Sequence, residues 1–286
     1  MADSVADSAD FSQETVESIA LTETYSFPDG DVRWRKLGDQ GKPIVLVHGT
    51  PYSSVLWRDI APALAQSRQV FVFDHLGFGQ SDMREGQDLS IAAHARRFAE
   101  LVRSWDAGPI SVAANDIGGA ITLRSLLLED AQFRDLTLFD CVSGGEWEVG
   151  LFAQIRANPE LFADLPGYAH RALVTSHLDN AVHSGYKPGV REAYLKPWLG
   201  EDGQAAFYRQ YRQLSQTDTA DYAHLLAGIE LPVKLLWGRH DRIVPPPFGR
   251  WLADHVRHDE FIWVDNAGHL LQEDAPAQLT ATLLTK

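Results

Sequence analysis

The sequence predicts an α/β protein with a doubly wound, mostly parallel sheet and a helical segment inserted near the middle of the chain. Short apolar runs of strand length alternate with stretches of helical periodicity along most of the sequence. Several of these runs, including residues 44–48, are almost wholly apolar, which is typical of parallel strands covered by helices on both faces. The alternation stops between residues 143 and 230, where the sequence contains only helical stretches.

Most of the strands are expected in the first half of the chain. Residues 18–27 and 31–37 are predicted to pair as a hairpin around the turn Pro28-Asp29-Gly30. The buried strands that follow are predicted at residues 44–48, 69–73, 110–114 and 136–142. The helices between the strands are predicted at residues 53–66, 90–107 and 120–124.

The second half of the chain completes the sheet after an interruption. We expect residues 143–230, which are rich in aromatic residues and histidines, to form a helical cap. The cap is expected to cover the carboxyl ends of the strands, where open α/β sheets bind ligands. After the cap, the sequence predicts two further strands of the sheet at residues 232–237 and 260–264, and an amphipathic helix at residues 275–284.

The expected organisation is one α/β core with an insertion, which suits a chain of 286 residues. Residues 18–142 and 231–286 are assigned to the core, and residues 143–230 to the cap. Residues 1–17 are acidic and polar, and we expect them to form a flexible arm.

The charge balance limits the partners of this protein. Lysine and arginine number 25 against 39 aspartates and glutamates, which gives a formal net charge of −14. Such acidity argues against binding to nucleic acid or to an anionic membrane. The sequence has neither a signal peptide nor a run of about 20 apolar residues, so we expect a cytoplasmic protein.

The cysteine and histidine positions do not indicate a metal or a cofactor. The single cysteine, Cys141, excludes a disulfide framework and a cysteine-based zinc cluster. His170, His177 and His183 are not spaced like a ligand set on one helix face, and we expect partly exposed cap residues. We therefore expect no metal and no cofactor.

Residues 109–124, PISVAANDIGGAITLR, have the outline of a nucleophile elbow. An apolar strand is followed by a sharp turn and then by a helix. Ala114 and Gly118 supply the small residues needed where the two backbones approach closely. The nucleophile position is held by Asp116, whose other interpretation is a helix N-cap.

Two further residues complete the pattern of a catalytic triad. Asp241 follows the strand at residues 232–237, and His269 follows the last strand. Because the carboxyl ends of parallel strands meet at one edge of a sheet, we expect Asp116, Asp241 and His269 to converge there. Asp140, after the sixth strand, is the alternative to Asp241 as the acid.

An aspartate nucleophile implies chemistry through an ester. The carboxylate is ionised at neutral pH and can displace a leaving group from a saturated carbon, which gives an alkyl-enzyme ester. His269, oriented by Asp241, then acts as general base for the water that hydrolyses this ester. The backbone N–H groups of Thr50 and Ile117 are expected to form the oxyanion hole.

Four motifs resemble the α/β-hydrolase superfamily over nearly the whole chain. They are His48-Gly49-Thr50-Pro51, the run DHLGFGQSD at residues 74–82, Asn115-Asp116-Ile117-Gly118-Gly119 and Gly268-His269. With an aspartate as nucleophile, the chain resembles the branch that contains epoxide hydrolases, haloalkane dehalogenases and haloacetate dehalogenases. The resemblance implies the α/β-hydrolase fold and a small, largely apolar organic substrate that reacts with water.

The same resemblance bears on the leaving group. Haloalkane dehalogenases hold the halide with an asparagine and a tryptophan at the positions of Thr50 and Ile117, and haloacetate dehalogenases place arginines near the elbow. Epoxide hydrolases use cap tyrosines to protonate the epoxide oxygen. Tyr194, Tyr208 and Tyr211 are the candidates for this role, since they lie in the middle of the helical stretch.

We therefore expect a hydrolase that opens an epoxide to a diol. The alternatives are a haloalkane or haloacid dehalogenase that works through the same ester, and a non-catalytic small-molecule binding protein on the same fold. A serine esterase has no support, because the sequence lacks Gly-x-Ser-x-Gly.

Overall fold

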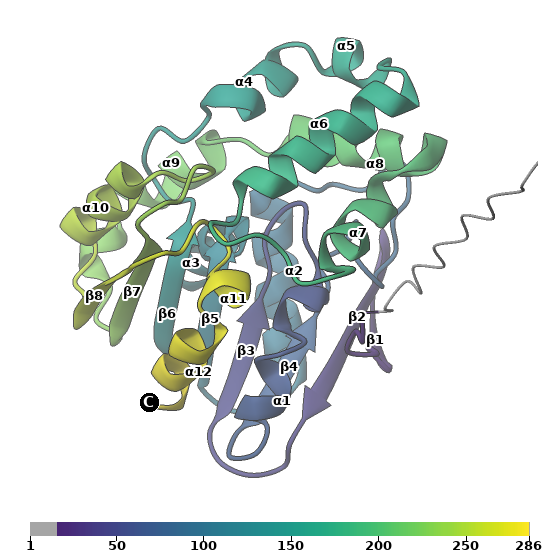
Figure 1. Cartoon of the computed structure of the whole chain (residues 1–286). Helices are drawn as coiled ribbons and strands as arrows, with labels where there is room; N and C mark the ends of the chain where they lie inside the picture. Colours follow the sequence, from purple (N-terminus) through teal and green to yellow (C-terminus); the bar gives the residue numbers. More distant parts are fainter. Residues whose placement is uncertain (1–15, 286) are drawn as a thin grey trace, which may run out of the picture.

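The structure is a computed structural model that describes residues 16–285, and the arm predicted at residues 1–17 lies almost entirely outside this range. Within it, eight strands form one sheet in the order β1-β2-β4-β3-β5-β6-β7-β8 (Figure 1). The strands are β1 (Glu23–Phe27), β2 (Gly30–Leu37), β3 (Pro43–Val47), β4 (Gln69–Phe73), β5 (Ile110–Asp116), β6 (Phe133–Cys141), β7 (Val233–Gly238) and β8 (Glu260–Val264). Pairing is parallel from β4 to β8, whereas β2 is antiparallel to both β1 and β4. The predicted doubly wound, mostly parallel sheet is confirmed.

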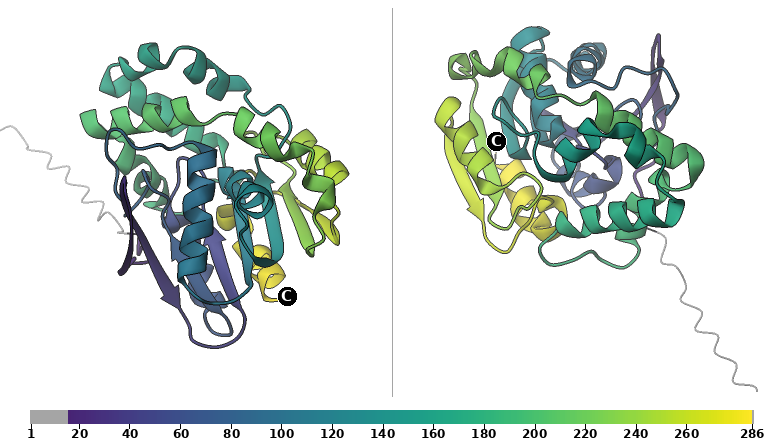
Figure 2. Two further views of the ribbon diagram at one scale, coloured as in Figure 1. Left: turned by 180° about the vertical axis from the view of Figure 1, so that it is seen from behind. Right: turned by 90° about the horizontal axis from the view of Figure 1, so that it is seen from above.

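Helices cover both faces of this sheet. On one face, toward the viewer in the left panel of Figure 2, α2 (Ile91–Ser104) packs against α3 (Ile117–Leu128). On the other face, α1 (Ala61–Leu64) contacts α12 (Pro276–Leu284), and both lie in front of the sheet in Figure 1. The remaining core helices are α10 (Pro246–His255), which packs on β7, and the short α11 (Leu271–Asp274).

The prediction of a single helix at residues 53–66 is wrong. The chain forms a 3-10 turn, η1 (Ser54–Trp57), before the separate helix α1. Pro62 explains the break, because proline has no backbone N–H and its ring collides with a preceding helical turn. Proline is tolerated in the first turn of a helix, which is where Pro62 lies in α1.

The chain between β6 and β7 is helical, as predicted for residues 143–230. Its helices are α4 (Gly150–Ala157), α5 (Pro159–Ala163), α6 (Gly167–Asn180), α7 (Val190–Leu195), η2 (Lys196–Trp198), α8 (Gly200–Gln213), α9 (Thr217–Ala223) and η3 (Leu226–Gly228). Figure 1 and the right panel of Figure 2 show most of them across the end of the sheet at which the parallel strands finish. None of the helices in residues 16–285 is both long and apolar enough to cross a membrane.

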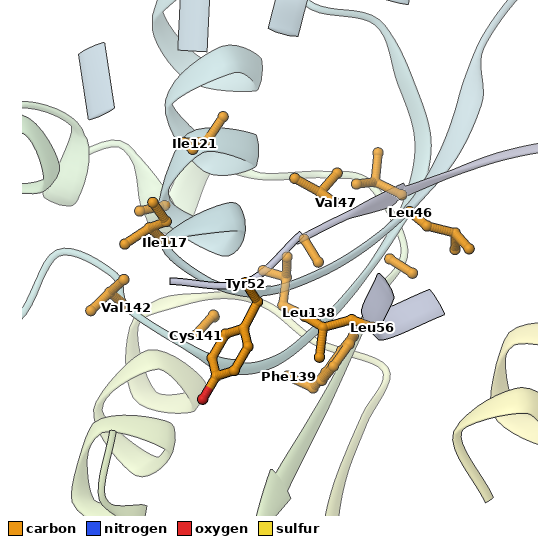
Figure 3. Close-up of a cluster of buried hydrophobic side chains, with 14 of the residues drawn as sticks. Leu46, Val47, Tyr52, Leu56, Ile117, Ile121, Leu138, Phe139, Cys141 and Val142 are labelled. Carbon is orange, nitrogen blue, oxygen red and sulfur yellow. The ribbon is translucent and has the colours of Figure 1, made fainter. Parts of the chain in front are cut away.

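The turn after β5 rests on packed apolar side chains (Figure 3). Val47 of β3 and Leu138 and Cys141 of β6 are fully buried, and Ile117 and Ile121 of α3 pack with them. Burial of an aliphatic side chain of this size contributes about 1.5–3 kcal/mol to folding. The end of the central strand β5 is therefore a rigid support for a functional side chain.

Candidate active site

Asp116 occupies the sharp turn between β5 and α3. Its backbone angles, φ 52° and ψ −135°, are unfavourable for a residue with a side chain and persist only where the surroundings impose them. The close approach of the backbone requires glycine at the next positions, since a Cβ on Gly118 would lie 2.7 Å from the carbonyl oxygen of His48. The Asp116 side chain makes no capping hydrogen bond to α3, so the N-cap interpretation has no support.

The two oxygens of the Asp116 carboxylate have different partners. The backbone N–H of Thr50 donates to Oδ1 at 2.8 Å, and Oδ2 lies 3.4 Å from Nε2 of His269. Gly49 permits this approach, because a Cβ there would lie 2.5 Å from Oδ1. The second expected oxyanion donor, Ile117, is the first residue of α3 and lines the same cavity as Thr50.

His269 lies between Asp116 and Asp241. Its Nδ1 is 3.0 Å from Oδ2 of Asp241, and the other Asp241 oxygen accepts from the backbone N–H groups of Ile243 at 2.8 Å and Val244 at 2.9 Å. A carboxylate can only accept, so His269 carries its proton on Nδ1 and presents Nε2 to Asp116. The structure thus brings the three predicted triad residues together at one edge of the sheet.

The surroundings of His269 favour its charged form. Burial lowers its pKa, but attraction to Asp241 and contacts with Asp116 outweigh burial and raise the pKa well above the ordinary histidine value. Part of this effect depends on the negative charge of Asp116, so loss of that charge would return the pKa of His269 toward neutrality.

A small cavity of about 70 Å³ lies beside Asp116. Four of its lining residues are polar, namely Thr50, Asp116, His177 and Tyr211. The others are apolar or aromatic: Ile117, Val142, Trp147, Val149, Phe152, Ile243, Val244 and Phe248. No lysine or arginine lines it, so the cavity suits a small uncharged molecule.

Tyr211 and His177 place polar atoms at the cavity from two different helices. The phenol oxygen of Tyr211, on α8, lies 3.2 Å from Nε2 of His177, on α6. Burial, reinforced by the charge of Asp116, raises the pKa of Tyr211 and keeps the phenol protonated. Burial also lowers the pKa of His177 to about 4, so its ring is neutral at neutral pH.

Comparison with known proteins agrees with the fold described above. A family model described as the alpha/beta hydrolase fold matches residues 42–276, which is most of the chain. The chain belongs to the α/β-hydrolase fold family.

The hydrolases that resemble this α/β hydrolase differ in their named activities. A solved α/β-hydrolase fold protein from Burkholderia ambifaria is 38% identical, with a TM-score of 0.90 over 95% of this chain and 100% of that one. Haloalkane dehalogenase 2 of Mycobacterium tuberculosis (strain ATCC 25618 / H37Rv) is 24% identical over 268 residues, which cover 86% of this chain and 88% of that protein. Lipase 1 of Psychrobacter immobilis is 24% identical over 247 residues, covering 82% and 73%. The expectation that this protein is a hydrolase with the α/β-hydrolase fold is confirmed.

The other two candidate tyrosines of the α/β hydrolase are bonded elsewhere. The Tyr194 hydroxyl donates to Glu273 and accepts from Arg58, and the Tyr208 hydroxyl is 3.0 Å from Nδ1 of His170. Neither Tyr194 nor Tyr208 lines the cavity beside Asp116. Of the three tyrosines selected from the sequence, Tyr211 alone lies there.

His177 is the residue of the cavity that sequence reasoning missed. The sequence predicts a partly exposed histidine there, and the side chain is indeed partly exposed, but it also lines the cavity that contains Asp116. Its electrostatic contacts include both His269 and Asp116. Its position one residue before the buried Leu178 offered only a weak signal, because the sequence does not show which face of α6 meets the core.

The side-chain donors of Trp147, Thr50 and Arg124 are engaged within the protein. The indole N–H of Trp147 donates to Thr219 at 2.8 Å, and the Thr50 hydroxyl donates to Gln210 at 2.5 Å. Arg124 donates to the carbonyl oxygen of Asp218 and to the carboxylate of Asp221, and does not line the cavity. Within residues 16–285, no group of three or more histidine, cysteine, aspartate or glutamate side chains could hold a metal ion.

Proposed function

We propose that this α/β hydrolase opens small epoxides to diols through an ester on Asp116, with residues 143–230 acting as the cap that supplies the acid. The observation that carries the proposal is the Tyr211–His177 pair, which lines the same cavity as the Asp116 carboxylate. A nucleophile with a proton donor facing it across one cavity is what ring opening requires.

In the first step, Oδ2 of Asp116 attacks an epoxide carbon. The carbon–oxygen bond of the ring breaks, and its electron pair stays on the oxygen, which takes the phenolic proton of Tyr211. Nε2–H of the neutral His177 ring donates to the Tyr211 oxygen and stabilises the phenolate. A departing epoxide oxygen is strongly basic and requires this proton, whereas a halide leaves as a stable anion.

In the second step, water hydrolyses the ester. Formation of the ester removes the negative charge of Asp116, so the pKa of His269 falls and its Nε2 releases its proton to solvent. The neutral ring can then accept a proton from the attacking water. The hydroxide attacks the ester carbonyl, and the N–H groups of Thr50 and Ile117 stabilise the resulting oxyanion. The tetrahedral intermediate collapses, and the departing alkoxide takes the proton from His269 and leaves as the diol. The carboxylic acid left on Asp116 loses its proton, which returns to Tyr211.

The cavity limits the substrate. A space of about 70 Å³ with mostly apolar walls admits a short aliphatic chain, and the absence of lysine and arginine from the lining disfavours a haloacid. We therefore propose short, uncharged epoxides as the substrate class. The second candidate is a haloalkane dehalogenase, which the similarity to Haloalkane dehalogenase 2 favours.

Parallel assays on a short-chain epoxide and on the bromoalkane of equal length distinguish these functions. The proposal predicts diol formation, with bromide release at least about a hundredfold slower. Bromide release without diol formation would establish the dehalogenase instead. Saturable binding of both compounds without any product would identify a binding protein.

A further inference from the structure

A second buried carboxyl group lies beside the His269–Asp241 pair and has no role in the steps above. Asp140 lies near the carboxyl end of β6. It is fully buried, and its φ of 44° is in the left-handed region. Its Oδ1 accepts from the backbone N–H of Gly238 at 2.7 Å. Its Oδ2 has no N–H or hydroxyl partner among the described residues, although it is shielded from water.

The neighbour of Asp140 is the acid of the proposed triad. Strands β6 and β7 are adjacent, and Gly238 at the end of β7 bonds to both residues. Its N–H donates to Asp140, and its carbonyl oxygen accepts from the Asp241 N–H at 3.2 Å. Asp140 and Asp241 are therefore both anchored to Gly238, and their carboxyl groups interact. Two ionised carboxylates have only acceptor atoms, so this contact is stable only when one of them carries a proton.

The hydrogen bonds indicate which carboxyl carries that proton. Asp241 accepts three, from the backbone N–H groups of Ile243 and Val244 and from Nδ1–H of His269. Asp140 accepts one, from Gly238. Hydrogen bonds to a carboxylate stabilise its charged form, so the charge belongs on Asp241 and the proton on Asp140.

We propose that Asp140 is a neutral carboxylic acid that donates a hydrogen bond to Asp241 and positions the Asp241–His269 pair. The donated hydrogen bond holds the Asp241 carboxylate in place and withdraws negative charge from it. Asp241 therefore attracts a proton on His269 less strongly than an isolated buried carboxylate would. Only the consequence for catalysis rests on the proposed function, since the protonation of Asp140 is a property of the free protein.

The groups around the pair are consistent with this assignment. Burial raises the pKa of Asp140, the charge of Asp241 raises it further, and a charged His269 opposes both. The adjacent Cys141 thiol is neutral, because burial raises its pKa. His269 in turn faces Asp116 and Asp241, and its charge also acts on the neutral His177.

Two variants of similar size separate the donor from its packing. Asp140→Asn keeps a hydrogen-bond donor for Asp241, whereas Asp140→Leu removes it. Infrared difference spectra at neutral pH compare the wild type with each variant, and we expect loss of a band from a protonated carboxylic acid in both. NMR titration of His269 in the free proteins should give similar pKa values for wild type and Asp140→Asn, and a value higher by about one unit for Asp140→Leu.

Absence of a protonated-acid band from the wild-type spectrum, or equal His269 pKa values in the Asn and Leu variants, would show that Asp140 has no such role. If Asp140→Leu does not fold, the wild-type spectrum and the Asp140→Asn titration still test whether Asp140 is protonated. A charged Asp140 in the wild type would make the pKa of His269 fall on replacement by asparagine, whereas a neutral Asp140 would leave it unchanged. None of these measurements needs turnover, so failure of the proposed epoxide chemistry would leave them intact and would be recognised separately.

For the reaction itself, the expected signature is a pH profile. Hydrolysis of the ester requires neutral His269, so its acid limb should move upward by about one pH unit in Asp140→Leu and remain in place in Asp140→Asn. A lower rate in Asp140→Leu with an unchanged pH profile would indicate a packing role and would contradict the proposal.

Discussion

Nε2 of His269 faces Oδ2 of Asp116 at 3.4 Å, while the other oxygen of Asp116 is held by the Thr50 N–H at 2.8 Å. One carboxylate thus has one oxygen in the expected oxyanion site and the other directed at the histidine. A carboxylate needs no base for its own attack, so His269 is free to act on water in the second step. This division of work can be tested one residue at a time.

Asp116→Asn is expected to abolish turnover while the fold remains intact. An amide is a far weaker nucleophile than a carboxylate, and we expect a loss of at least about a thousandfold in kcat. The side-chain volume and the Thr50 contact are kept, so the free energy of unfolding should change by less than about 1 kcal/mol. Steady-state kinetics and thermal unfolding check both values, and a folded variant with near-normal kcat would exclude Asp116 as the nucleophile.

His269→Gln is expected to trap the ester. Attack by Asp116 does not require the histidine, but hydrolysis should slow by about 10²–10⁴-fold without the base. Intact-protein mass spectrometry after mixing with an epoxide should show a mass increase equal to the substrate. If the variant turns over no substrate and also forms no adduct, the proposed order of steps is wrong.

Tyr211→Phe is expected to slow ring opening specifically. Loss of the phenolic proton removes the acid that the epoxide oxygen needs, and we expect a decrease of about 10²–10⁴-fold in the rate of ester formation. Tyr208→Phe is the matched control, because Tyr208 lies three residues before Tyr211 on α8 and is bonded to His170 outside the cavity. Rapid-quench measurement of ester formation should separate the two variants, and equal rates would remove Tyr211 from the mechanism.

The stability of the folded protein is expected to fall in mild acid. Burial lowers the pKa values of His48, His75 and His94, and Nε2 of His48 accepts from the His75 backbone N–H, which requires a neutral ring. Below the unfolded-state pKa of about 6.5, the unfolded chain binds protons that the folded protein does not, so stability declines as the pH falls.

Thermal unfolding between neutral and mildly acidic pH measures this decline. His94→Gln should make the melting temperature less dependent on pH in this range, because one buried neutral ring is removed. His224→Gln is the control, since His224 is exposed and should leave the slope as it is. A wild-type melting temperature that is constant across this range would contradict the account.

The sequence was sufficient for the sheet and for the elbow because both depend on local patterns. β5 is buried at every position and ends in Asn115-Asp116, and Ile117-Gly118 begin α3, so the strand, the turn and the helix could each be predicted from their residues. The break between η1 and α1 within residues 53–66 could not be predicted in this way, because the apolar periodicity concealed the effect of Pro62 on the backbone.

The cavity could be predicted only in part, since it depends on how the inserted helices lie over the sheet. Tyr208 and Tyr211 are neighbours on α8 with the same chemistry, yet one hydroxyl meets His170 and the other meets His177 beside Asp116. The rotation of α8 about its axis decides between them, and it is set by tertiary packing. The same packing places His177 in the cavity.

The central claim is that the substrate becomes esterified to Asp116, and a single turnover in water enriched in ¹⁸O tests it most directly. With enzyme in excess over an epoxide, water attacks the ester carbonyl, so one ¹⁸O atom should enter the peptide that contains Asp116 while the diol stays unlabelled. Mass spectrometry of the digested protein and of the product measures both. Label in the diol and none in that peptide would show direct attack of water on the epoxide and would contradict the ester mechanism.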